Sequence, residues 1–100
     1  MPTLHLKKIK CIEQEDWTFH DDVVVKVNGK VVNFHSMDAG DTDTIDEYVQ
    51  FTGKALIEIY EADYGGDDDD FLGAHTVRRG RGVLEFTEDD AHYKLSYAVE

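Results

Sequence analysis

Short stretches of alternating apolar and polar residues recur along the whole sequence, and clusters of turn-forming residues separate them. The clearest pair is 22–27 and 30–36, which flank Asn28-Gly29. An Asn-Gly dipeptide between two Val-rich stretches is the strongest short-range signal of a β-hairpin, because both residues accept the positive φ of a tight turn. No window sustains the 3.6-residue repeat of an amphipathic helix. The pattern therefore predicts a fold built from strands alone.

About eight strands follow from this pattern, at 4–13, 22–27, 30–36, 45–51, 55–60, 72–78, 83–86 and 92–99. In the first, the alternation slips near Lys7-Lys8, which predicts a β-bulge. Cys11 is the only cysteine, so no internal disulfide is possible, and we expect it to pack as a small apolar residue. Many short strands with regularly spaced turns are typical of sandwiches and barrels. We expect an all-β, antiparallel Greek-key β-sandwich.

The length and the charge of the chain limit the functions that it could have. One hundred residues are enough for one domain with a modest core, so 1–100 is expected to form a single domain. The net charge of −12 argues against nonspecific binding to nucleic acid or to an anionic bilayer. Without an apolar run of membrane-spanning length or a signal peptide, a cytoplasmic protein is expected, and export by another route stays open. The serines lack a nucleophile-elbow motif and Cys11 lies within a predicted strand, so catalysis is not expected.

Acidic and basic residues fall in different connections between the predicted strands. The odd-numbered connections carry acidic residues and no Lys or Arg, and these residues are Glu15, Asp16, Asp21, Asp38, Asp41, Asp43, Asp63, Asp67 to Asp70 and Glu88 to Asp90. The even-numbered connections contain Asn-Gly-Lys, Thr-Gly-Lys and Arg-Gly-Arg without an acid. Alternate connections of antiparallel strands lie at the same end of a fold, so one end is expected to be anionic. Carboxylates from separate loops repel each other unless a cation lies among them, which indicates a calcium site.

Two of the acidic connections carry motifs in a particular order. The first contains Asp16 and, six residues later, Asp22, which opens a strand ending in Lys-Val. The third contains Glu61-Ala62-Asp63 and later Asp70, directly before Phe-Leu-Gly. These motifs resemble those of the C2 domain, a calcium- and phospholipid-binding β-sandwich, and the resemblance spans about residues 4–77.

The resemblance implies that the first and third connections bind one or two calcium ions. The implied side-chain ligands are Asp16, Asp22, Glu61, Asp63, Asp67 and Asp70. Glu61 stands where the family usually has Asp, and the third connection is about one residue longer than usual, so Asp69 is an alternative to Asp70. The same connections carry Trp17, Phe19 and Tyr64. Apolar loop tips of this family enter bilayers once calcium neutralises the carboxylates, which implies a calcium-dependent membrane or protein partner.

Other interpretations of the acidic residues fit less well. An EF-hand loop starting at Asp41 fails, because Asp46 and Thr52 replace the required Gly and Glu. The histidines and Cys11 show no zinc-ligand spacing. Two alternatives stay open, an acidic protein-interaction module that mimics nucleic-acid phosphates and a structural sandwich whose acids maintain solubility. A mimic spreads its acids along a face, whereas here they gather in loops at one end.

Overall fold

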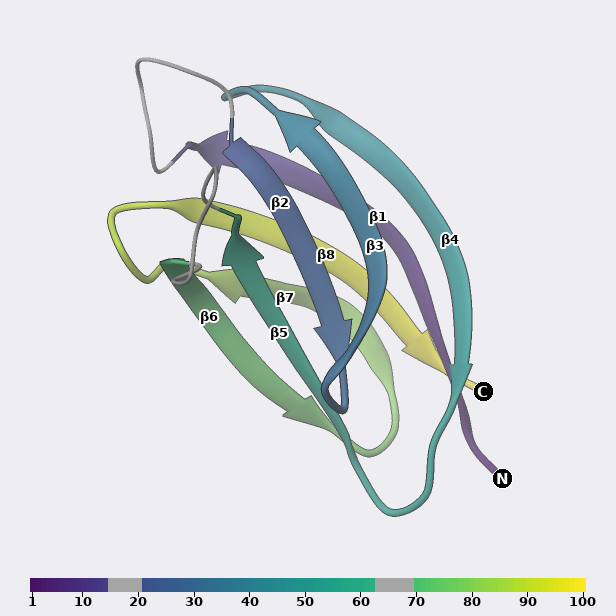
Figure 1. Cartoon of the computed structure of the whole chain (residues 1–100). Helices are drawn as coiled ribbons and strands as arrows, with labels where there is room; N and C mark the ends of the chain where they lie inside the picture. The colour runs from purple at the N-terminus through teal and green to yellow at the C-terminus, as the bar shows by residue number, and fades with distance from the viewer. Residues whose placement is uncertain (15–20, 63–69) are drawn as a thin grey trace.

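The computed structural model describes residues 1–14, 21–62 and 70–100 (Figure 1). Its secondary structure consists of β1 (Thr3–Glu13), β2 (Asp21–Val27), β3 (Lys30–Met37), β4 (Thr42–Gln50), β5 (Ala55–Glu61), β6 (Asp70–Val77), β7 (Arg81–Phe86) and β8 (His92–Val99). The described residues form no helix, and hence none that is long and apolar enough to span a membrane. The all-β prediction is confirmed, with all eight expected strands present.

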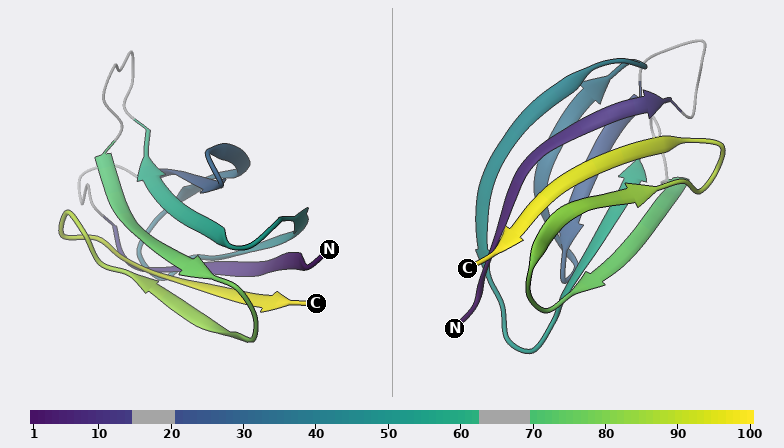
Figure 2. Two further views of the ribbon diagram at one scale, coloured as in Figure 1. Left: turned by 90° about the horizontal axis from the view of Figure 1, so that it is seen from below. Right: turned by 180° about the vertical axis from the view of Figure 1, so that it is seen from behind.

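The strands form two antiparallel sheets that face each other (Figure 2). Sheet A has the order β4-β1-β8-β7, and sheet B has the order β3-β2-β5-β6. The pairs β2–β3, β5–β6 and β7–β8 are neighbours within a sheet, whereas the chain changes sheet between β1 and β2, β3 and β4, β4 and β5, and β6 and β7. These crossings between layers produce the predicted Greek-key sandwich.

Two local predictions are confirmed. Asn28 and Gly29 have φ values of 49° and 85°, as a tight hairpin between β2 and β3 requires. The Asn28 side chain also accepts a hydrogen bond from the backbone N of Leu56 at 2.8 Å, which ties this turn to β5. In β1 the register shifts between Leu6 and Lys8 against both neighbouring strands, which is the expected bulge.

The core lies between the sheets and follows the two-residue alternation of the strands. Fully buried side chains come from both layers, among them Leu4, Leu6, Ile9, Cys11, Val25, Ile57, Ile59, Leu72, Tyr93 and Leu95. Removal of this apolar surface from water is the main driving force for folding. Cys11 is 0% exposed, which confirms its predicted packing.

The connections of the sandwich separate into two ends (Figure 1). At one end β1, β3, β5 and β7 finish, and the described acids Asp38, Asp41 and Glu88 to Asp90 lie in the connections there. The turns at the opposite end include Lys54 and Arg79. Asp21, Asp43 and Asp70, which we assigned to connections, instead belong to β2, β4 and β6. We call the first end the acidic end.

Candidate metal centre

Three of the six predicted ligands lie in the described part of the chain, and adjacent strands of sheet B carry them. Asp22 is the second residue of β2, Glu61 ends β5 and Asp70 begins β6. Glu61 pairs with Val23 of β2 on one side and with Asp70 on the other. The backbone N of Asp22 lies 3.5 Å from Glu61 Oε1. Asp16, Asp63 and Asp67, together with the alternative Asp69, lie outside the described residues.

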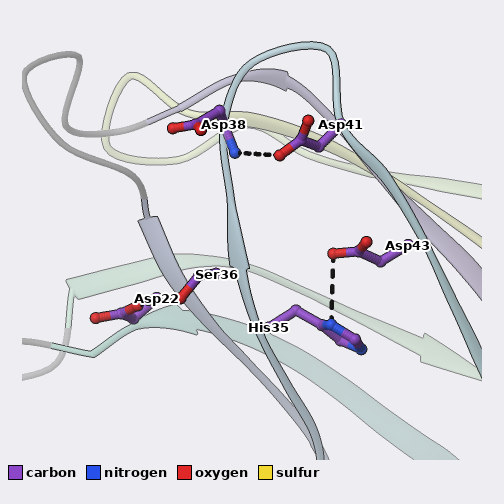
Figure 3. A network of polar contacts seen from close by, with 6 residues as sticks. All are labelled: Asp22, His35, Ser36, Asp38, Asp41 and Asp43. Atoms are coloured by element: carbon purple, nitrogen blue, oxygen red, sulfur yellow. Dashed lines mark hydrogen bonds and ion pairs between the residues drawn. The ribbon is translucent and has the colours of Figure 1, made fainter.

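The register places the side chains of Asp22 and Glu61 on opposite faces of sheet B. Glu61 pairs with the core-facing Val23, and Asp22 therefore points outward. There the Ser36 hydroxyl donates a 2.8 Å hydrogen bond to Asp22 Oδ1; Figure 3 shows the two side chains together. Within 1–14, 21–62 and 70–100, no three His, Cys, Asp or Glu side chains form a group that could hold a metal ion.

The sequence analysis counted Asp21 as a loop acid and missed its structural role. Asp21 is 0% exposed, and the Tyr93 hydroxyl donates a hydrogen bond to its Oδ2 at 2.5 Å. The signal was present in the sequence, because in a strand that starts one residue earlier Asp21 shares a face with Val23 and Val25. Asp21 therefore joins the start of β2 to β8 across the sandwich.

Burial controls the ionisation of the groups beneath the acidic end. It is the largest cause that raises the pKa of Tyr93 far above its ordinary value, and the hydrogen bond to Asp21 raises it further. Burial also raises the pKa of Cys11, the cross-strand partner of Tyr93, although a hydrogen bond with Tyr93 acts in the opposite direction. Both side chains therefore stay neutral in the folded protein at physiological pH.

These raised pKa values predict a loss of stability in alkali. The unfolded chain releases the Cys11 and Tyr93 protons near their ordinary pKa values of 9.0 and 10.0, whereas the folded protein retains them. The two groups therefore contribute fully to the free energy of unfolding below these pH values. Above them, each group lowers the free energy of unfolding by up to about 1.4 kcal/mol per pH unit. Urea denaturation between pH 8 and pH 11 would measure the slope, which Tyr93→Phe should reduce and Tyr48→Phe should not. A flat profile would contradict the expectation.

The acids of the β3–β4 connection stabilise a turn. The backbone N of Asp38 donates to Asp41 Oδ2 at 2.8 Å, and the backbone N of Asp41 donates to the Asp38 carbonyl at 3.0 Å (Figure 3). The turn is fixed to β1, because the Gly40 N donates to the Cys11 carbonyl and the Cys11 N donates to the Asp41 carbonyl. These contacts match the ordinary turn chemistry of Asp.

Most of the histidines lie in strands, as expected, and several contact carboxylates. His35 Nδ1 of β3 lies 3.4 Å from Asp43 Oδ2 of β4, so this pair joins the two sheets at one edge (Figure 3). The other strand histidines are His5, His75 and His92, whereas His20 lies outside the described residues.

Comparison with known proteins supports the fold. No protein-family model and no curated protein matches the sequence. A solved C2 domain superposes with a TM-score of 0.65 and 14% identity, covering 100% of this chain and 99% of the other. A structure of the two tandem C2 domains of extended synaptotagmin 2 matches with a TM-score of 0.58 and 16% identity, covering 99% of this chain and 39% of the other.

A third match is human GIVD cytosolic phospholipase A2, with a TM-score of 0.54, 12% identity and coverage of 99% of this chain and 17% of the enzyme. The chain therefore spans the full length of one solved C2 domain and a minor part of the two larger structures. At these identities the similarity concerns the architecture. The chain has the fold of a C2 domain, in agreement with its sequence motifs.

Proposed function

We propose that the acidic end binds calcium and that the protein is a calcium-dependent binding module. The supporting observation is the register of sheet B, which places Asp22, Glu61 and Asp70 at the same end of three adjacent strands, with the Asp22 side chain on the opposite face of the sheet from Glu61. Calcium prefers six to eight oxygen ligands in a flexible arrangement, and carboxylates are its commonest anionic ligands. The chemistry of this donor set therefore suits calcium better than a softer metal.

Chain connectivity keeps the other implied ligands within reach. Asp63 follows Glu61 by two residues, and Asp67 precedes Asp70 by three. Even a fully extended backbone limits the Cα separation of Glu61 and Asp63 to about 7 Å, and that of Asp67 and Asp70 to about 11 Å. Asp16, six residues before Asp22, is limited to about 20 Å. The hydrogen bond from Ser36 to Asp22 Oδ1 takes one acceptor position of a carboxylate that has about four, so Asp22 could keep this bond and ligate an ion.

Calcium would change the charge of one end. Two ions would move the net charge from −12 to −8 (−12 + 4), and the change would be concentrated where the carboxylates repel each other. Attachment to a membrane or protein partner would then depend on calcium, because bound calcium weakens the local repulsion between the acidic end and an anionic surface, while the net charge of the protein stays negative. This is the use that the C2-like motifs imply, and it supports a binding role over catalysis.

Calcium should stabilise the folded protein. At a tenfold excess of free calcium over its dissociation constant, the free energy of unfolding should rise by about 1.4 kcal/mol. The double variant Asp16→Asn with Asp63→Asn should abolish this gain, which urea denaturation with calcium or chelator would measure. A matched control is Asp89→Asn with Asp90→Asn, which removes the same charge at the same end. Both control positions have positive φ, 55° and 62°, which Asn accepts readily.

If cations only screen the charges of the acidic end and bind no specific site, the experiment gives a different result. In that case magnesium or sodium chloride would stabilise as much as calcium, and both double variants would respond alike. Such an outcome would contradict a specific site and favour a structural or phosphate-mimicking acidic sandwich. Isothermal titration with calcium supplies an independent readout, because a specific site gives saturable heat.

A further inference from the structure

Half of the positive side chains gather on sheet A, although the protein is strongly acidic overall. Of the ten Lys and Arg residues, five exposed ones lie on the adjacent strands β1, β8 and β7, and they are Lys7, Lys8, Lys10, Lys94 and Arg81. Lys10 and Lys94 are direct cross-strand partners. Like charges in this arrangement are destabilising. On its other side Lys94 pairs with Glu85, which offsets part of this repulsion. We call this surface the basic face, and an external anion would relieve the repulsion that remains between Lys10 and Lys94.

Histidines contact two acids on the strands of sheet A, Asp46 of β4 and Glu85 of β7. Asp46 Oδ1 is 2.7 Å from His5 Nε2, and Glu85 Oε1 is 2.8 Å from His92 Nε2. The hydrogen bond from His92 lowers the pKa of Glu85, with Lys94 as a further electrostatic contributor. In the described part of the chain, no carboxylate forms an ion pair with Lys8 or Lys10.

A cavity adjoins the basic face at the end opposite the acidic end. Its volume is about 300 Å³, and its lining consists of Lys7, Gly80, Arg81, Ala98, Val99 and Glu100. The bulge in β1 leaves Lys7 out of both ladders, and the small residues Gly80 and Ala98 leave space between Lys7 and Arg81.

We propose that the basic face binds a polyphosphorylated ligand, with one phosphate in the cavity between Lys7 and Arg81. A guanidinium matches a phosphate with two parallel hydrogen bonds, and an ammonium adds a compact point charge. The lining side chains carry two positive charges, on Lys7 and Arg81, and one negative charge, on Glu100. Lys8, Lys10 and Lys94 lie on the same strands and bind further anionic groups. This site is independent of calcium, since none of its residues belongs to the candidate metal centre.

Titration of the full chain with tripolyphosphate tests the proposal. Calorimetry in a chelator and at low ionic strength should show saturable binding, and added salt should weaken it. The double variant Lys7→Ala with Arg81→Ala should weaken binding at least tenfold. The matched control is Lys30→Ala with Lys54→Ala, which removes the same charge from the first residue of β3 and the turn before β5, and it should change binding by less than about twofold.

Vesicles distinguish a lipid headgroup from a free phosphate compound. Sedimentation is measured in chelator with phosphatidylcholine vesicles, with and without phosphatidylinositol phosphate. Vesicle binding that tripolyphosphate displaces assigns the site to a headgroup, and tripolyphosphate binding alone assigns it to a soluble ligand. The proposal is overturned if neither probe binds saturably, or if both double variants lose binding equally. Calcium binding can fail without affecting this result, because the chelator is present throughout.

Discussion

Replacing Gly73 by alanine is expected to lower the free energy of unfolding by about 3 kcal/mol. Gly73 lies in β6 with a φ of 141°, a conformation that L side chains rarely adopt. An added Cβ would lie 3.1 Å from Phe86 Cβ and 3.2 Å from Phe86 Cα. Phe86 is 1% exposed, so its backbone and side chain have little room to move. Overpacking of a core costs about 1–3 kcal/mol, and a strained backbone conformation adds about 1–3 kcal/mol.

A matched glycine separates the two causes. Gly82 has a similar φ, 156°, but an added Cβ there meets only Tyr97 Cε1, at 4.0 Å. Gly82→Ala should therefore show the backbone term of about 1–3 kcal/mol without the clash. Urea denaturation of both variants gives the comparison. Equal losses would show that the contact with Phe86 is unimportant, which would contradict the close packing of β6 against β7.

The same glycine links the core to the candidate metal centre. The register between β5 and β6 shifts next to it, from the pair Ile59–Gly73 to the pair Tyr60–Phe71. This irregularity sets the position of Asp70 opposite Glu61. Gly73→Ala should therefore also weaken the proposed calcium response, provided that the variant is measured where it remains folded.

Local features of the fold could be predicted from the sequence, because short segments determine them. Asn28-Gly29 specifies its turn by backbone preference alone, and the slip near Lys7-Lys8 indicates the bulge directly. The C2-like motifs could also be recognised, since they depend on order and spacing. Their strand ends do lie together for Asp22, Glu61 and Asp70.

Features that depend on long-range register could not be predicted in the same way. The opposite orientations of Asp22 and Glu61 follow from the pairing of Val23 with Glu61, which joins distant segments. The pairing of Lys10 with Lys94 joins segments that are even farther apart in the sequence. We considered basic residues only in the connections, and the basic face therefore escaped the sequence analysis. Asp21 was missed for a local reason, because β2 begins one residue before the predicted strand.

Tyr93→Phe is expected to destabilise the protein by about 2 kcal/mol although it removes a single oxygen. The Tyr93 hydroxyl is the hydrogen-bond donor to Asp21 Oδ2, and both residues are 0% exposed. A hydrogen bond to a carboxylate contributes about 1.5–3 kcal/mol, and a buried carboxylate that loses one of its hydrogen bonds cannot replace it with a bond to water. Tyr48→Phe is the control, because Tyr48 is 57% exposed and should change stability by less than about 0.5 kcal/mol.

A double-mutant cycle with Asp21→Asn identifies the cause of that loss. Asn has no net charge, so its burial without the Tyr93 hydroxyl should cost less than burial of a carboxylate. The loss from Tyr93→Phe should therefore be smaller in the Asp21→Asn background than in the wild type, which is a measurable coupling between the two residues. Additive losses would show that Tyr93 contributes through packing alone. The hydrogen bond would then not be what holds the start of β2, and Asp22 beside it, against β8.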